Sequence, residues 1–198
     1  MTKRPKPRIE SLSDLIFGLA LSIGAISLIS RVPATESRML IDIAEFGFSF
    51  LILISVWLGY TNIMSVLPME DRTAIILNIV LLFLVSVEPY LFYLNVIFDL
   101  SAHELLLNSA SILYALDMTG LMLILALFTH ELAREERGLV PKELLTAYRG
   151  VRNMLFISAA LFAITILPVF WILRLWNLPA RFYLWIVPLI LSSVRRIS

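Results

Sequence analysis

Residues 46–69 read FGFSFLILISVWLGYTNIMSVLPM, a run without a single charged side chain. A helix needs roughly 20 mostly apolar residues to cross the hydrocarbon core of a bilayer. This run is long enough, and it ends at Pro68, which cannot continue a regular helix. The stretch therefore predicts a membrane-spanning helix, and it fixes the class of fold in which the rest of the chain must be placed.

Five further apolar runs of similar character flank this one. The run on its C-terminal side is interrupted only by Glu88, the next only by Asp117, and the last only by Arg181 near its start. We expect one all-α, polytopic membrane domain over residues 1–198 with six transmembrane helices. The predicted spans are about 11–30, 40–67, 72–98, 104–133, 150–173 and 178–195.

The composition agrees with a membrane protein. The chain has 198 residues, of which 60% are hydrophobic and 16% are charged, whereas soluble domains carry about 25% charged residues. The mean hydropathy is +0.90. A net charge of +1 gives no basic field that would attract nucleic acid, and the absence of cysteine excludes disulfides and thiolate metal sites. We expect a lipid bilayer as surroundings, no nucleic-acid partner and no resident metal.

The distribution of positive charge predicts the orientation. With six spans both termini lie on one side, and that side carries twelve of the 16 lysines and arginines, against four on the other. Loops rich in Lys and Arg stay in the cytoplasm. Both termini are therefore expected to be cytoplasmic, and Arg174 and Arg181 are expected to reach the outer surface.

The first predicted span begins with polar residues and continues with a stripe of aliphatic ones. Ser13 and Asp14 at its start can cap a helix and interact with its dipole. Leu19, Ile23 and Ile26 follow at spacings of four and three, so they share one face of a helix, with Ser22 beside them. Such a stripe is usual in ordinary helix packing, and the spacing alone does not separate packing from a pore.

The polar start also carries a family resemblance. Arg8-Ile9-Glu10-Ser11-Leu12-Ser13-Asp14 resembles the first-helix signature of the transmembrane protein 175 family of potassium channels, which is an arginine, three residues and then Phe-Ser-Asp. Trp57 late in the second span, and Asn78 followed by Pro89 in the third, are similar to further features of that family. Leu12 replaces the phenylalanine, and Tyr60 stands near the place where many members carry a histidine.

The resemblance implies a pore made by the first helix of each of four copies. Six helices in about 200 residues is the family's single-repeat prokaryotic form, and a homotetramer is the assembly it implies. By position, Leu19 would form the narrowest ring, Ile23 and Ile26 further apolar rings, and Ser22 would stand where the family usually has a threonine. The residues that would tie the first helix to its neighbours are Arg8, Ser13, Asp14, Trp57 and Asn78.

The expected function is therefore a cation channel that prefers potassium, in a prokaryotic plasma membrane. The chain has no Thr-Val-Gly-Tyr-Gly filter, so monovalent cations would pass hydrated through an apolar constriction that gates by dewetting. No cofactor is expected besides the permeant potassium ions. No catalytic motif is present, and His103 and His130 are predicted on opposite sides of the membrane.

Two other functions stay open at this point. Glu88 and Asp117 lie inside predicted spans, where a charge costs about 2.5–3.5 kcal/mol on insertion scales. They could serve a proton-coupled secondary transporter, or they could be buried as neutral acids with no transport role. A membrane scaffold that transports nothing is the third alternative.

Overall fold

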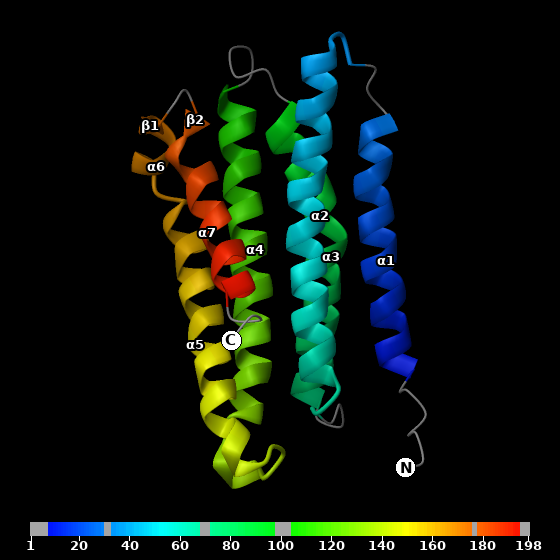
Figure 1. The fold of residues 1–198 in the computed structure, drawn as a ribbon, viewed down its shortest axis with the longest axis vertical. Helices are drawn as coiled ribbons and strands as arrows, with labels where there is room; N and C mark the ends of the chain where they lie inside the picture. Colours follow the sequence, from blue (N-terminus) through cyan, green and yellow to red (C-terminus); the bar gives the residue numbers. More distant parts are fainter. Residues whose placement is uncertain (1–7, 30–32, 68–71, 98–103, 176–177, 195–198) are drawn as a thin grey trace.

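The computed structural model describes residues 8–29, 33–67, 72–97, 104–175 and 178–194, and it consists of long helices that run side by side (Figure 1). Four long helices, of 22 to 29 residues, come first in the chain. The elements are α1 (Arg8–Ile29), α2 (Glu36–Met64), α3 (Arg72–Ile97), α4 (Glu104–Leu132), the 3-10 turn η1 (Glu135–Arg137), α5 (Lys142–Ile164), α6 (Val169–Ile172), β1 (Arg174–Leu175), β2 (Leu178–Pro179) and α7 (Ala180–Val194).

Local chemistry explains where these helices begin and end. The side-chain oxygen of Thr35 accepts a hydrogen bond from the backbone N–H of Arg38 at 3.2 Å, which caps the N-terminus of α2. Gly138 closes η1 with a φ of 58°, a left-handed conformation that glycine adopts without strain. Pro141 then precedes α5, where a residue without an N–H group costs no helical hydrogen bond.

The segment predicted as a fifth span, 150–173, contains a helix end. α5 begins earlier, at Lys142, and ends at Ile164, where the Thr165 hydroxyl donates to the Phe162 carbonyl at 2.6 Å. After Pro168 the chain makes the single turn α6 and a hairpin of two-residue strands, with Arg174 paired to Pro179. Two residues are too short a ladder to give an alternating pattern, so the sequence offered no signal for these strands.

α4 is the central helix of the bundle. It packs along α5 on one side and α3 on the other, while α1 packs against α3 and α2, and α7 packs against α5. In their most apolar windows, 56% of the α4 residues are buried, compared with 22% of the α2 residues. Figure 1 shows α1 at one edge of the bundle and α5 at the opposite edge. Within the part of the chain that the structure describes, the edge helix α1 therefore has one side without a neighbouring helix.

Among the described residues, three helices are long and apolar enough to cross a membrane: Glu36–Met64, Arg72–Asn95 and Asn108–Leu132. A shorter apolar stretch, Ser11–Ile26, lies in α1. The expectation of a helical membrane protein is confirmed at this level. The six span boundaries and the side of the termini stay predictions, because a helix by itself does not show where the bilayer lies.

The expected outward position of Arg181 is wrong. Its side chain is buried, with 1% exposure, at the start of α7. The guanidinium carbon lies 5.3 Å from the centre of the Phe182 ring and 5.8 Å from that of Trp171. A planar guanidinium is weakly hydrated and stacks on aromatic faces, so the rings around the hairpin can cover this side chain instead of releasing it to water.

Candidate functional site

The two faces of α1 differ sharply in exposure. One face carries the aliphatic stripe and has no neighbour among the described residues. Leu19 is 61% exposed, Ile23 43% and Ile26 59%, so the structure brings the three predicted pore residues together on one open face. Ser22 lies on the same face, and its hydroxyl donates to the Gly18 carbonyl at 2.8 Å. The face extends toward the start of the helix through Leu12 (52%) and Leu15 (71%).

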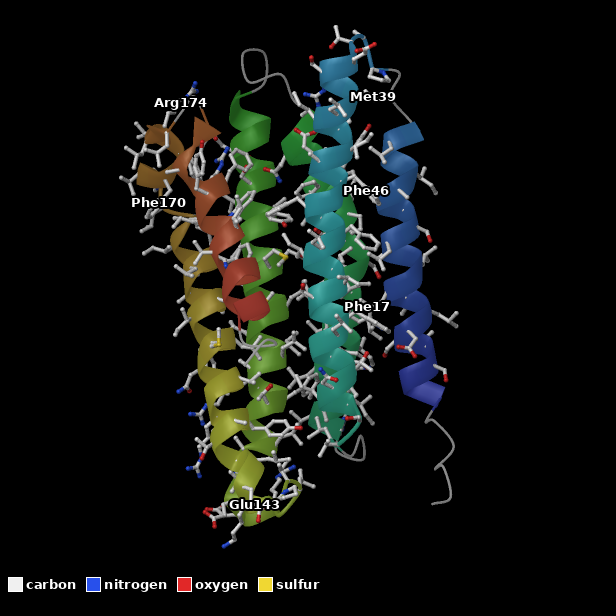
Figure 2. The ribbon with its side chains drawn as sticks, in the orientation of Figure 1. Phe17, Met39, Phe46, Glu143, Phe170 and Arg174 are labelled. Carbon is white, nitrogen blue, oxygen red and sulfur yellow. The ribbon has the colours of Figure 1, made fainter. Side chains whose placement is uncertain are left out.

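The opposite face of α1 holds the helix to the bundle. Phe17 is 1% exposed and points from α1 toward the neighbouring helices (Figure 2). Its ring lies 5.6 Å from that of Tyr60 on α2, measured between centroids. Ala20, one turn further along, is also 1% exposed. Small and aromatic residues alternate here, which lets the helices approach closely.

Two polar residues of the first-helix motif are paired with α2. The indole N–H of Trp57 donates to Oδ1 of Asp14 at 3.2 Å, and the Tyr60 hydroxyl donates to Oγ of Ser13 at 2.7 Å. Ser13 is fully buried and Tyr60 is 2% exposed. Hydrogen bonds between membrane helices contribute about 0.6–2 kcal/mol each. These two bonds therefore fix the height and rotation of α1 relative to α2.

The structure does not join every predicted member of this network. Asn78 on α3 is buried, with 2% exposure, but its side-chain oxygen has no hydrogen-bond partner. Arg8 is the first residue of α1, and its side chain lies outside the described part of the structure. Their roles in tying α1 to its neighbours stay predictions.

The two intramembrane acids are deeply buried in the other half of the bundle. Glu88 on α3 is fully buried, and the Ser49 hydroxyl of α2 donates to its two carboxyl oxygens at 3.2 and 3.3 Å. Asp117 on α4 is 4% exposed, and one of its oxygens has no hydrogen-bond partner. Neither acid lies on the open face of α1.

A cavity of about 530 Å³ lies between α2, α4, α5 and α7. Its walls are mainly aliphatic, aromatic and methionine side chains, including Ile52, Met122 and Phe162. Neither intramembrane acid and no residue of α1 lines it. The cavity is therefore separate from both groups of candidate residues.

Sequence reasoning missed two partners. Tyr60 was noted only as a replacement for a histidine, yet it supplies the donor to Ser13. Ser49 was not considered at all, although it is one of three serines in the apolar run of residues 46–69, and a polar side chain in such a run is a signal that could have drawn attention to it. Tyr90, two residues after Glu88, is 59% exposed, while Tyr114, three residues before Asp117, is fully buried near both acids.

Comparison with known proteins finds a family match over the first part of the chain. Residues 8–89 match the model of the family described as Endosomal/lysosomal potassium channel TMEM175. This part of the chain is similar to that family. The match begins at the arginine of the first-helix motif, ends at Pro89, and contains α1, α2 and most of α3. It thus confirms the TMEM175 resemblance on the residues that first indicated it, and the family is one of ion channels, not of enzymes.

A curated relative agrees with this assignment over a similar length. A potassium channel from Marivirga tractuosa is 28% identical to this chain over 90 residues. The matched stretch is 44% of this chain and 36% of that protein. The chain therefore aligns with only about a third of that relative.

Solved structures extend the likeness to the whole bundle. The crystal structure of a lysosomal potassium-selective channel TMEM175 homolog from Chamaesiphon minutus is similar with a TM-score of 0.64, at 19% identity, over 96% of this chain and 97% of that one. A variant of the potassium channel MtTMEM175, crystallised with a nanobody–MBP fusion, gives a TM-score of 0.60 at 17% identity, over 99% and 89%. At these identities the likeness shows the fold, which is that of TMEM175 proteins.

Proposed function

We propose that this chain is the subunit of a potassium-preferring cation channel whose pore is lined by the first helix of each copy in a homotetramer. The observation that carries the proposal is the open aliphatic face of α1. Leu15, Leu19 and Ile26 are each more than half exposed in the single chain, although the opposite face of the same helix is packed and hydrogen-bonded. A second copy, or the axis of a ring of copies, can cover such a face.

The family supports the ionic function of this face. The model that matches residues 8–89 describes a potassium channel, and the curated relative and both solved structures are named as potassium channels. One chain contributes one such face, so conduction requires assembly, for which closed cyclic symmetry is the usual solution. The proposed constriction is Leu19, with Ile23 and Ile26 as further rings and Ser22 as the polar layer between them.

A pore of this kind acts through wetting. Aliphatic rings hold no charged or carbonyl ligand that could replace the hydration shell of an ion, so a narrow ring excludes water and a wider one admits hydrated ions. Serine hydroxyls beside the rings can contact a hydrated cation, although the Ser22 hydroxyl is engaged by the Gly18 carbonyl in this conformation. The proposal includes six spans with both termini in the cytoplasm of a prokaryotic cell.

The test of the constriction is flux of potassium and sodium into liposomes that contain the purified chain. Leu19→Ala widens the proposed ring and is expected to raise cation flux. Ile79→Ala is the matched control, because Ile79 is 60% exposed in an apolar stretch of α3 but lies outside α1. Unchanged flux in a correctly assembled Leu19→Ala protein would remove Leu19 from the constriction.

The test of the assembly uses the absence of cysteine from the chain. A single cysteine introduced by Leu19→Cys would face its copies across the proposed axis, so oxidation in the membrane should give covalent dimers. The same substitution at Ile79 should give far fewer. A chain that remains a monomer in the bilayer, with no cross-link at Leu19, contradicts the pore.

The proton-coupled transporter remains the competing function. It requires Glu88 or Asp117 to exchange protons along a transport path, so its flux should need a proton gradient and disappear in Glu88→Gln. Passive potassium flux that survives both Glu88→Gln and Asp117→Asn favours the channel. A scaffold predicts no flux under any of these conditions. The burial of both acids away from the described cavity favours the channel over the transporter.

A further inference from the structure

The contacts between α3 and α4 define how these antiparallel helices are aligned. The Ser111 hydroxyl hydrogen-bonds to the side-chain oxygen of Asn95. The rings of Phe92 and Tyr114 lie 5.8 Å apart between centroids. Two turns beyond, a Cβ added at Gly120 would lie 2.8 Å from Cδ1 of Leu84. Three pairs of residues therefore face each other across the interface: Asn95 with Ser111, Phe92 with Tyr114, and Leu84 with Gly120.

Glu88 and Asp117 lie in the one helical turn between these contacts for which no facing pair has yet been named. Glu88 lies four residues before Phe92 on α3, and Asp117 lies three residues after Tyr114 on α4. Residues at these spacings share a helix face, so the two acids face each other between the Phe92–Tyr114 contact and the Leu84–Gly120 contact. The carboxyl groups are close enough to interact electrostatically, and the Tyr114 hydroxyl is within electrostatic reach of both.

Among the described residues, the groups around this pair are hydrogen-bond donors and acceptors, and none is a cation. Ser49 is the one hydrogen-bond donor to Glu88 among the described residues. The Tyr114 hydroxyl is fully buried and has no hydrogen-bond partner, and Oδ2 of Asp117 has none either. A buried donor and a buried acceptor beside two carboxyl groups leave hydrogen-bonding capacity that a small polar ligand can use.

Several other charged groups on the neighbouring helices are engaged elsewhere. On α1 Asp14 accepts from Trp57, and on α2 Asp42 and Glu45 pair with Arg38 near the start of the helix. On α7 Arg181 lies against aromatic rings. Within the described part of the chain, the ion pairs of the remaining arginines and lysines involve Glu131, Glu135 and Glu136, near the far end of α4.

Two facing carboxylates without a counter-ion cannot both carry a charge at this depth. Each charge inside the membrane costs about 2.5–3.5 kcal/mol on insertion scales, and like charges in contact add repulsion. Paired carboxyl groups in proteins relieve this by sharing a proton, so that one acid donates a hydrogen bond to the other. A proton placed between Glu88 and Asp117 would convert repulsion between α3 and α4 into a bond.

We propose that Glu88 and Asp117 form a proton-binding site between α3 and α4, with Ser49 and Tyr114 as its neutral hydrogen-bonding wall. Proton uptake holds the two helices together, and proton loss at alkaline pH weakens their interface. The site lies within one subunit and away from the open face of α1. It therefore goes beyond the proposed pore and does not depend on it.

The experiment is infrared spectroscopy of the full chain in lipid bilayers near neutral pH. A carboxyl group that holds a proton gives a C=O stretch that an ionised carboxylate lacks, and this band shifts in D2O. The wild-type chain should show the band, and Glu88→Gln and Asp117→Asn should each reduce or remove it. Glu45→Gln is the matched control, because Glu45 pairs with Arg38 as a carboxylate, and its loss should leave the band unchanged.

A second measurement tests the consequence for the interface, and it does not require the band to be resolved. The thermal midpoint of the wild-type chain should fall as the pH rises above neutral, because the folded state then loses a proton that stabilises it. In Glu88→Gln with Asp117→Asn the amides cannot ionise, so this alkaline loss should be absent. Ser49→Ala should retain the band but shift its frequency, since one hydrogen bond to Glu88 is removed.

Three results would overturn the proposal. One is a wild-type spectrum without a protonated carboxyl band near neutral pH. The second is a band that both amide variants leave intact. The third is a midpoint that depends on potassium or sodium relative to choline at constant pH, and not on pH itself, since that would assign the pair to a metal cation. Ion flux enters none of these readouts, so they are separate from the test of the pore.

Discussion

α1 and α4 are both apolar helices of this bundle, but α1 leaves aliphatic side chains uncovered, whereas α4 leaves buried polar atoms without hydrogen-bond partners. In α1 the buried side chain of Ser13 and the half-buried side chain of Asp14 are hydrogen-bonded, while Leu15 and Leu19 are 71% and 61% exposed. In α4 the core aliphatic side chains are covered, whereas the buried hydroxyl of Tyr114 and one oxygen of Asp117 lack partners.

The difference indicates what each helix still needs. An uncovered apolar face extends along a helix and can be covered only by something of similar extent, such as further copies of the chain or lipid. An unpaired polar group inside a packed interface needs a small polar ligand, and a proton is the smallest. The two helices therefore carry two different proposed features, an assembly surface on α1 and a proton site beside α4.

The largest effect is expected from the packed side of α1. Phe17→Ala removes an aromatic ring that is 1% exposed and contacts Tyr60. In soluble cores such a change costs about 3–5 kcal/mol, but lipid is as apolar as the vacated core, so we expect about 2–3 kcal/mol here. Unfolding in detergent by a mild denaturant would measure it.

Leu15→Ala is the matched control on the same helix, because Leu15 is 71% exposed. It should leave the stability of the single subunit nearly unchanged and weaken only the assembly. Equal losses of subunit stability for the two variants would show that the two faces of α1 do not differ in the folded chain, and the comparison with α4 would then have no basis.

A smaller effect is expected from the polar link between α1 and α2. Tyr60→Phe removes the hydroxyl that donates to Ser13 at 2.7 Å and leaves the Ser13 oxygen buried without this donor. The expected loss is about 0.5–2 kcal/mol in the free energy of unfolding. Tyr90→Phe serves as control, since Tyr90 is 59% exposed and its hydroxyl is open to the surroundings. A Tyr60→Phe protein as stable as the control would mean that the motif does not position α1.

The sequence predicted the helices better than the relations between them. Long uncharged runs located α2, α3 and α4, and the spacing of Leu19, Ile23 and Ile26 correctly placed them on one face, because both inferences use only local periodicity. The facing of Glu88 and Asp117 was out of reach. It depends on how far α3 is shifted along α4, and that shift is set by contacts such as Leu84 against Gly120, which no periodicity encodes.

The same limit applies to polar partners and to helix breaks. The motif indicated that Asp14 and Trp57 belong together, but it gave no reason to choose Tyr60 as the partner of Ser13. The apolar run of 150–173 gave no sign that α5 ends at Ile164, because apolar composition does not distinguish a helix from the turn that follows it. The prediction for Arg181 was wrong because its charge indicated a position in water, whereas aromatic rings cover the side chain.

The smallest effect, and the one with the opposite pH dependence, is expected at an acid outside the bundle. Glu135 lies in η1, and the Lys142 ammonium 3.0 Å away lowers the pKa of its carboxyl below the ordinary 4.5 through a hydrogen bond and through its charge. A depressed carboxyl pKa stabilises the folded state above the unfolded value, and this contribution is lost as the pH falls through the folded pKa. The buried pair of Glu88 and Asp117 should have the reverse effect, so that the folded state loses stability as the pH rises.

Glu135→Gln and Lys142→Gln, alone and combined, isolate this pair in a double-mutant cycle of thermal midpoints. Both side chains are exposed, so water and salt screen the interaction, and the coupling should be small at neutral pH in low salt. It should be lost once acid protonates Glu135, and it should weaken in high salt. A coupling that instead persisted in acid and grew weaker toward alkaline pH would mean that the protonated form of Glu135 is the stabilising one. The contrast between acids at the surface and acids between α3 and α4 would then fail, because burial would no longer decide which protonation state holds the fold.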